Sequence, residues 1–202
     1  MTELFYAEDG QPRCKWVGIA PEFVAYHDAE WGFPVVDDTR LFEKLCLEGF
    51  QSGLSWRTIL AKRDNFRAAF AGFDMRTVAA FTDADVARLL ENAGIVRHKG
   101  KIEAAINNAA RGLDLVAEYG TLAAYFWSYE PDEGELAAPL SLSLSAVSTA
   151  ISKDLKKRGW KFVGPTTIYA FMQAMGLIND HAEGCCVRAQ VVAARSTFQK
   201  PA

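Results

Sequence analysis

The chain has 202 residues, of which 50% are hydrophobic and 12% aromatic, and its formal net charge is −3. This length suits one domain, and the hydrophobic fraction excludes a disordered chain. The slight negative charge excludes a protein that is basic over its whole surface, although a local basic strip is enough to bind phosphates. We predict a single domain over residues 1–202, with an ordered core from about residue 12 to residue 188 and flexible termini.

The first residues and the cysteines indicate the compartment. MTELFYAEDGQPR lacks the basic start and apolar run of a signal peptide, and no apolar run approaches ~18 residues. We therefore expect a cytoplasmic protein with no membrane segment. Disulfides are rare in the cytoplasm, so we expect free, buried or metal-bound thiols at Cys14, Cys46, Cys185 and Cys186.

The first half of the chain has the pattern of successive capped helices. In DDTRLFEKLCLEGF (37–50), an aspartate cap precedes apolar residues at helical spacing. Ser55 is expected to cap one helix that continues to Gly72. Thr82 is expected to cap the next helix, with Asp85 completing a capping box.

Glycines are expected to end the helix that Thr82 caps and the helix that follows it. Gly94 would stop the helix that Thr82 caps, in the left-handed conformation, and Gly120 would stop a helix over about residues 99–119. TLAAYFWSY then predicts a short aromatic helix. EPDEGELAAPLSLSLS is the least periodic stretch, so we expect a linker or surface loop there.

Helical periodicity returns near the C-terminus, in SAVSTAISKDLKKRG and in GPTTIYAFMQAMG, where Pro165 suits a first helical turn. The residues from about Ala189 onward are expected to be frayed. Strict alternation of apolar and polar residues is scarce. We therefore predict an all-α fold, a compact bundle of irregular helices.

Two pairs of candidate metal ligands lie near opposite ends of the chain. Cys14 and His27 form the first pair; His181 and Cys185, four residues apart, would share one face of a helical turn. Two thiolates and two imidazoles form a closed tetrahedral Zn²⁺ set with no position for water, which is a structural site. Ordinary buried cysteines and histidines remain the alternative, and Cys186 is a competing ligand.

Among the acidic residues of segment 37–50, Glu48 is the candidate functional residue. On a helical projection it lies beside Leu41 and Leu45, on the flank of the apolar face. A carboxylate in that position is costly unless it is hydrogen-bonded or paired. The pattern alone favours a boundary glutamate whose head group reaches solvent or an arginine.

Six blocks of the sequence are distinctive in their order: RCKWVG, AYHDAEWG, CLEGFQSGLSW, AGIVRHKGKI, KKRGWKFVGPTT and FMQAMGLINDH. Together they resemble the bacterial type I 3-methyladenine DNA glycosylase family of the helix-hairpin-helix superfamily, over about Cys14 to Cys186. The resemblance implies one catalytic glycosylase domain of helix-hairpin-helix type. It also implies one structural zinc, held by Cys14, His27, His181 and Cys185, that joins the N- and C-terminal segments.

The resemblance further implies a monofunctional DNA repair enzyme. Such an enzyme hydrolyses the N-glycosidic bond of 3-methyladenine in alkylated double-stranded DNA, releases the free base and leaves an abasic site, without lyase activity. We expect it to act as a monomer. Asp180 lies near the place of a catalytic aspartate in the wider superfamily, but it could equally orient His181, so it is not counted as catalytic.

Glu48 becomes the expected pocket acid, because the resemblance places that acid in its block. 3-Methyladenine in DNA is cationic and carries an amine donor, which a carboxylate in a dry pocket complements. Aromatic walls add stacking and cation–π attraction. Phe23 stands where relatives often have tyrosine, so a hydroxyl is missing there. The candidate wall residues are Trp16, Phe23, Tyr26, Trp31 and Trp56.

The run KDLKKRGWK and the glycine turn KFVGPTT, which opens a helix, suggest a phosphate-binding hairpin. By resemblance, the loop at Leu54 enters the duplex where the base has left. A solvated helix face and a turn with a buried leucine are the alternatives. The predicted DNA contacts are Gln51, Gly53, Leu54, Lys161, Gly164 and Thr166.

Two other function classes stay open. A non-catalytic, zinc-stabilised helix-hairpin-helix DNA-binding module would use the same zinc and hairpin, and only Glu48 with its aromatic neighbours argues against it. A zinc hydrolase is disfavoured, because four protein ligands leave no position for an activated water.

Overall fold

The computed structural model describes residues 4–132, 134 and 136–201. It is mostly helical, as predicted. A two-stranded antiparallel hairpin precedes the helices, with Leu4 opposite Cys14 in β1 (Leu4–Tyr6) and β2 (Pro12–Cys14). The helices are α1 (Phe23–Ala29), α2 (Asp38–Gln51), α3 (Trp56–Leu60), α4 (Arg63–Ala69), α5 (Met75–Ala79), α6 (Asp83–Glu91), α7 (Lys99–Tyr119), α8 (Leu122–Trp127), α9 (Ala146–Lys157), α10 (Pro165–Ala174) and α11 (Arg188–Ser196), with short 3-10 helices η1 (Lys15–Ile19) and η2 (Ala71–Phe73).

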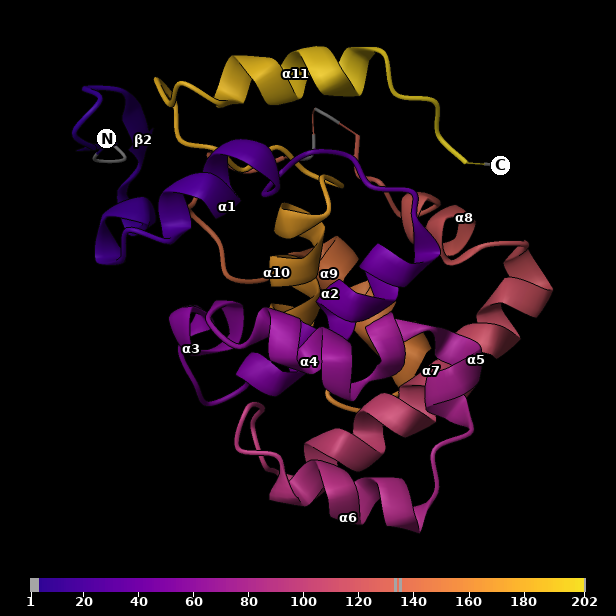
Figure 1. Cartoon of the computed structure of the whole chain (residues 1–202). Coiled ribbons are helices and arrows are strands. Elements are labelled where there is room, and N and C mark those ends of the chain that lie inside the picture. Colours follow the sequence, from indigo (N-terminus) through magenta and orange to yellow (C-terminus); the bar gives the residue numbers. More distant parts are fainter. Residues whose placement is uncertain (1–3, 133, 135, 202) are drawn as a thin grey trace.

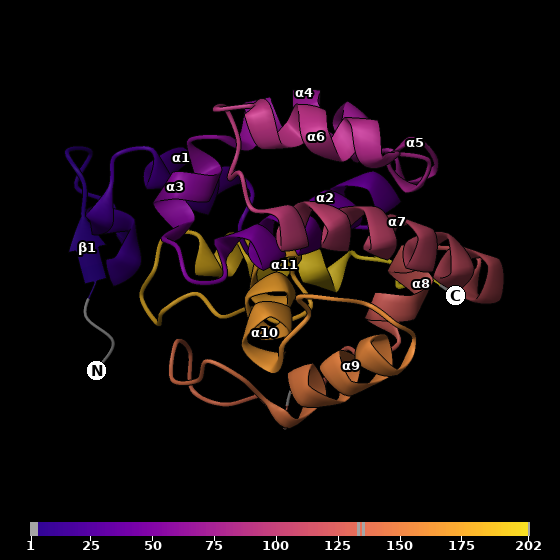
Figure 2. The same cartoon turned by 90° about the horizontal axis from the view of Figure 1, so that it is seen from below.

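Helices α2 and α10 form the centre of the molecule. They pack against each other, α9 packs on α10, and α7 and α8 pack on α2. Figure 1 shows α11 on one side of this centre and α6 on the opposite side. In Figure 2 the hairpin of β1 and β2 lies at one end of the molecule, beyond α1 and α3. None of the described helices combines the length and the apolar character needed to cross a membrane.

The predicted helix starts are confirmed by their capping hydrogen bonds. An Asp37 carboxylate oxygen accepts from the Arg40 N–H at 2.8 Å, and the Ser55 hydroxyl accepts from the Thr58 N–H at 3.2 Å. Thr82 and Asp85 form the expected capping box. These caps depend on residues within one turn, which is why the sequence alone predicts them.

Two predicted helix ends are wrong. The helix that Ser55 caps stops at Leu60, and a second one begins at Arg63, so the segment up to Gly72 is broken. Gly94 does not take the left-handed conformation; instead its N–H donates to the Asn92 side chain at 2.8 Å after α6 has ended. Gly120, with φ 83°, ends α7 as predicted.

Both ends of the described chain hold more structure than the sequence predicts. The hairpin strands have three residues each, too few to show alternation. The tail predicted to fray from Ala189 instead forms α11, whose Val191 is fully buried in the core. The two ends also meet, since the Cys186 N–H donates to the Pro12 carbonyl at 2.8 Å. The predicted loop between α8 and α9 holds neither α-helix nor strand in its described residues.

Candidate active site

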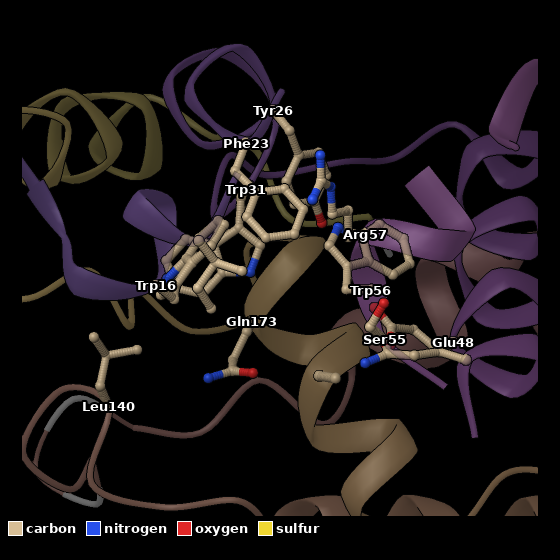
Figure 3. Close-up of a pocket in the computed structure, with 13 residues that line it drawn as sticks. Trp16, Phe23, Tyr26, Trp31, Glu48, Ser55, Trp56, Arg57, Leu140 and Gln173 are labelled. Carbon is tan, nitrogen blue, oxygen red and sulfur yellow. The ribbon is translucent and has the colours of Figure 1, made fainter. Parts of the chain in front are cut away.

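A cavity of about 310 Å³ opens between α1, the end of α2, α3 and α10 (Figure 3). Its volume is at the lower end of the range of small-molecule sites, so it suits a ligand of one or two rings. All the predicted pocket residues line it: Trp16, Phe23, Tyr26, Trp31, Glu48 and Trp56. Gln51, one of the predicted DNA contacts, lines it as well.

The aromatic residues form a continuous wall. The ring centroids of Trp16 lie 5.6 Å from Phe23 and 5.2 Å from Trp31, and those of Tyr26 and Trp56 are 5.4 Å apart. Phe23, Tyr26 and Trp31 are buried in the core, so their rings are fixed by packing. A rigid aromatic wall is suited to stacking against a flat ring.

Glu48 is the acid of this pocket, and it is only 6% exposed. One turn earlier on α2, the Lys44 Nζ lies 2.7 Å from the Glu48 Oε1. The interpretation from the pattern alone, a boundary glutamate that reaches solvent or an arginine, is therefore wrong. The carboxylate is a buried group with a lysine partner.

Lys44 is the main feature that the sequence analysis missed. Its Nζ donates to the Tyr26 hydroxyl at 2.8 Å and lies 3.4 Å from the centroid of the Trp56 ring. Burial lowers the pKa of Lys44, and the charge of Glu48 acts in the opposite direction. The i, i+4 spacing of Lys44 and Glu48 on a predicted helix was the available signal.

The predicted metal ligands also come together. The ligand atoms of Cys14, His27 and Cys185 lie within 4.8 Å of one another, and all three residues are buried. The fourth predicted ligand, His181, lies beside them: its ring centroid is 4.9 Å from that of His27, and its Nε2 is buried without a hydrogen-bond partner. An orphaned imidazole nitrogen next to two thiols and an imidazole fits a Zn²⁺ donor set.

The ionisation of this cluster also suits a metal. Burial lowers the pKa of His181 to about 4, helped by the nearby His27, so its ring is neutral at pH 7. A hydrogen bond from the Cys14 thiol lowers the pKa of Cys185, which favours the thiolate. Neutral imidazole and thiolate are the forms that bind metal. Cys186, the competing candidate, is outside the group of three.

Neighbouring polar groups orient the two histidines. The His27 Nδ1 lies 2.7 Å from the Asp28 Oδ1, and the His181 Nδ1 lies 3.1 Å from the Asn179 Oδ1. The idea that Asp180 orients His181 is therefore wrong. The Asp180 carboxylate instead accepts from the Gln173 Nε2 at 2.6 Å and the Leu140 N–H at 2.8 Å, two residues that line the pocket.

The cluster of predicted metal ligands lies directly behind the aromatic wall. The ring centroid of Trp31 is 4.6 Å from that of His181, and the ring centroid of Trp16 is 5.4 Å from that of His27. The predicted ligands therefore support two of the rings that line the pocket. This contact links the ends of the chain to the shape of the cavity.

The loop between α2 and α3 is exposed beside the pocket. Gly53 has φ 79°, a left-handed conformation that favours glycine, and the next residue, Leu54, is 43% exposed. The alternative of a buried leucine in this turn is therefore wrong. Lys101 holds the start of the loop, because its Nζ donates to the carbonyls of Phe50 at 2.9 Å and Ser52 at 2.5 Å.

The hairpin between α9 and α10 lies beside the C-terminal part of α2, where Phe162 is next to Gly49. Lys161 and Thr166 are exposed and Gly164 is the N-cap of α10. Asn108 fixes the hairpin, since its side chain exchanges hydrogen bonds of 2.8 and 2.9 Å with the Lys161 backbone. Arg158 is held in ion pairs with acidic side chains, so the exposed basic residues of the run are Lys153, Lys156, Lys157 and Lys161.

Fold and site together define a helical protein with a small aromatic pocket, an acid inside it, and an exposed loop and basic hairpin near it. Residues 16–189 match the model of the methyladenine glycosylase family. The chain belongs to this family.

Named relatives and solved structures agree with this assignment. The chain is 49% identical over 178 residues to DNA-3-methyladenine glycosylase 1 of Escherichia coli (strain K12), a match that covers 86% of this chain and 95% of the relative. It is 44% identical to DNA-3-methyladenine glycosylase of Haemophilus influenzae, over 86% of this chain and 96% of the relative. A crystal structure of 3-methyladenine DNA glycosylase I matches with a TM-score of 0.79 at 49% identity, over 86% of this chain and 98% of the other.

A further solved structure concerns recognition of the base. It describes 3-methyladenine recognition by 3-methyladenine DNA glycosylase I from Staphylococcus aureus. It matches with a TM-score of 0.78 at 36% identity, over 84% of this chain and 92% of that one.

Proposed function

We propose that this chain is a DNA repair glycosylase that hydrolyses the N-glycosidic bond of 3-methyladenine in alkylated double-stranded DNA. The products are the free base and an abasic site. The observation that carries the proposal is the buried Glu48 inside an aromatic pocket, in a chain that is 49% identical to an enzyme named for this reaction.

The pocket recognises the base by charge and shape. Methylation at N3 gives the adenine in DNA a positive charge and leaves its exocyclic amine as a donor. Glu48 accepts from that amine, and the charge assists the hydrogen bond. The rings of Trp16, Tyr26 and Trp56 provide stacking and cation–π attraction. The base reaches the pocket only after it has turned out of the duplex.

The chemical step requires little acid–base work from the protein. The cationic base is already a good leaving group and departs without first being protonated, while water supplies the oxygen that joins the sugar. The catalytic contribution is then the tight binding of the extruded, charged base, with Glu48 near the developing charge of the sugar. We propose no Schiff base and no lyase activity, because no lysine is among the residues that line the pocket in the described chain.

Two surface features hold the DNA in this proposal. Leu54, exposed on its turn, fills the gap that the extruded base leaves, and Gln51 lies at the edge of that gap. The hairpin before α10 binds the phosphate backbone through Lys161, Thr166 and the backbone N–H groups in the first turn of α10 after Pro165, which has no N–H itself. The whole chain works as one domain and as a monomer.

We propose that one structural zinc is held by Cys14, His27, His181 and Cys185. The buried, unpartnered Nε2 of His181 beside the three other ligands supports this assignment. A closed set of four protein ligands supplies no activated water, so the metal stabilises the fold and takes no part in hydrolysis. It joins the N-terminal segment to the residues that precede α11.

The experiment that tests the function is incubation of methylated duplex DNA with the purified protein, followed by chromatography of the released bases. We expect 3-methyladenine in the supernatant, and no strand cleavage until the abasic sites are treated with alkali. Binding to methylated DNA without release of any base would instead support the non-catalytic DNA-binding module.

A further inference from the structure

Lys101 is a buried lysine outside the base pocket, and the proposed function gives it no part. It lies in the first turn of α7, is 8% exposed and does not line the main pocket. Its ammonium reaches the end of α2, where the Nζ donates to the Phe50 carbonyl at 2.9 Å and to the Ser52 carbonyl at 2.5 Å. Figure 1 shows the loop after α2 and the turn before α7 close together, below α3. Lys101 therefore joins two segments that are distant in the sequence.

The two carbonyls that Lys101 contacts belong to the turn that ends α2. This helix ends at Gln51, and the last carbonyls of a helix lack an N–H one turn further on. The Gln51 carbonyl accepts from the Leu54 N–H at 2.6 Å. The carbonyls on either side of it, those of Phe50 and Ser52, accept from the Lys101 ammonium instead. The backbone and Lys101 together fix the turn that carries Leu54.

The tip of this loop has little packing of its own. Residues 52–55 are all exposed, and Leu54 is 43% exposed. Gly53 has φ 79°, and nothing lies within 4 Å of the place where a Cβ on it would stand. A surface loop with few packed side chains keeps its shape through its hydrogen bonds. Removal of the two bonds from Lys101 should therefore free the tip while the rest of the fold stays intact.

The charge of Lys101 has no acidic partner in the described part of the chain. Burial lowers the pKa of Lys101, with no neighbouring carboxylate acting in the opposite direction. A buried ammonium without a counter-ion is costly, so a lysine that served only stability would be expected to face an acid. The negative end of the α2 dipole, with its carbonyls, takes the place of that acid. This costly arrangement occurs beside the loop that the proposed function assigns to DNA.

The turn that holds Lys101 also contacts the hairpin between α9 and α10. The His98 side chain accepts from the Lys101 N–H at 3.3 Å, and its ring centroid is 6.3 Å from that of Phe162. Phe162 in turn lies against α2, since a Cβ on Gly49 would be 3.4 Å from the Phe162 Cβ. The end of α2, the start of α7 and the hairpin therefore meet around Lys101. The loop that carries Leu54 is held in a fixed place relative to the hairpin.

We propose that Lys101 is a positioning residue, which holds the loop between α2 and α3 so that Leu54 enters the gap that the extruded base leaves in the duplex. This inference rests on the proposed function, because it concerns the proposed DNA contact of Leu54. Lys101 touches neither the base nor the sugar and acts through the backbone of the loop. Its charge is used on the two carbonyls and not on a phosphate.

The test measures how strongly the protein prefers a duplex with a gap. The gapped probe contains one tetrahydrofuran residue, a stable analogue of an abasic site, and the comparison is the same duplex with an intact base pair. Dissociation constants are measured by fluorescence anisotropy with the full chain, and the preference is their ratio. The proteins are wild type, Lys101→Met, Leu54→Ala and the double variant. Lys101→Gln, which keeps an N–H donor, replaces Lys101→Met if the methionine variant does not fold.

Lys99→Met is the matched control. Lys99 lies two residues before Lys101 on α7, but it is exposed and its Nζ is 3.6 Å from the Glu103 carboxylate. The control removes the same charge from the same end of the helix and leaves the hydrogen bonds of the loop in place. It is expected to leave the preference for the gapped duplex unchanged. Binding of free 3-methyladenine, measured by calorimetry, is expected to be unchanged in Lys101→Met, because the loop lies outside the pocket.

We expect wild type to prefer the gapped duplex, and we expect Lys101→Met and Leu54→Ala each to reduce this preference by about tenfold. The double variant should also lose about tenfold and not about a hundredfold, because both changes remove the same contribution. Losses that multiply overturn the proposal, as does a Lys101→Met protein that binds free 3-methyladenine much more weakly. Equal weakening of both duplexes by Lys101→Met also overturns it and indicates a phosphate contact. The proposed function fails separately, if wild type releases no 3-methyladenine from methylated DNA.

Discussion

Replacing Glu48 with glutamine removes the charge of the pocket acid and keeps its shape. Glu48 is buried and forms an ion pair of 2.7 Å with Lys44, so the change also leaves a buried ammonium without its counter-ion. Two unit charges about 4 Å apart interact by about 4 kcal/mol in a partly buried site. Because Lys44 already uses part of this attraction, we expect the extruded base to lose about 3 kcal/mol of binding.

That loss corresponds to a decrease in excision of about 150-fold, at about 1.4 kcal/mol for each factor of ten. The assay is release of 3-methyladenine from methylated DNA under single-turnover conditions. The free energy of unfolding should fall less, by about 1–2 kcal/mol, because glutamine still offers Lys44 an oxygen although a broken buried pair is costly.

The double variant Lys44→Met with Glu48→Gln separates the two effects. It removes the unpaired ammonium, so it should recover most of the lost stability while excision stays well below that of wild type. Excision by Glu48→Gln at the wild-type rate, with folded protein, would refute the assignment of Glu48 as the pocket acid.

Three further predictions concern the DNA contact, the metal and the N-terminal hairpin. Leu54→Ala should weaken binding to lesion-containing DNA by about tenfold and change the melting temperature little, since Leu54 is 43% exposed; a large drop in melting temperature with unchanged binding would contradict this. Purified protein should contain one equivalent of zinc, and Cys185→Ser should lose the metal and melt at a lower temperature; wild type with less than about half an equivalent argues against the site. A hydrogen bond from Arg13 lowers the pKa of Asp9 from 3.8 to about 2. The resulting stabilisation is present above about pH 4 and is lost as the pH falls through about 2, so Asp9→Asn should lower the melting temperature at pH 6 and leave it unchanged below pH 2; equal melting curves at pH 6 would contradict this.

Local signals in the sequence predicted much of the fold. The caps at Asp37, Ser55 and Thr82 depend on hydrogen bonds within one helical turn, and Pro165 occupies the first turn of α10 as expected. Gly120 ends α7 for an equally local reason. Such features need no knowledge of the rest of the chain.

Features that depend on distant segments were missed. The partner of Glu48 could have been solvent, an arginine or a lysine. Tyr26 on α1 and Trp56 on α3 enclose Lys44 against α2, and this packing makes Lys44 the partner. Likewise, Asp180 turns towards Gln173 and the distant Leu140 rather than to its neighbour His181. These side-chain partners are determined by tertiary contacts, which periodicity and spacing do not predict.

The pocket residues were predicted chiefly through the family resemblance. Composition alone gave no reason to select Trp16, Trp31 and Trp56 over other core tryptophans, yet all three line the cavity with Glu48. For the metal ligands, residue type and spacing suggested the same four residues, with Cys186 and ordinary buried side chains as alternatives, and the resemblance chose among these. The physical reason for the suggestion is that few combinations of thiols and imidazoles complete a tetrahedral set.

The central claim is that Glu48 recognises the base inside the aromatic pocket, and a crystal structure of the protein with 3-methyladenine tests it most directly. We predict the ring in the cavity between the aromatic side chains, with its exocyclic nitrogen within hydrogen-bond distance of a Glu48 oxygen. A base bound outside this cavity, or with its amine turned away from Glu48, would contradict the account.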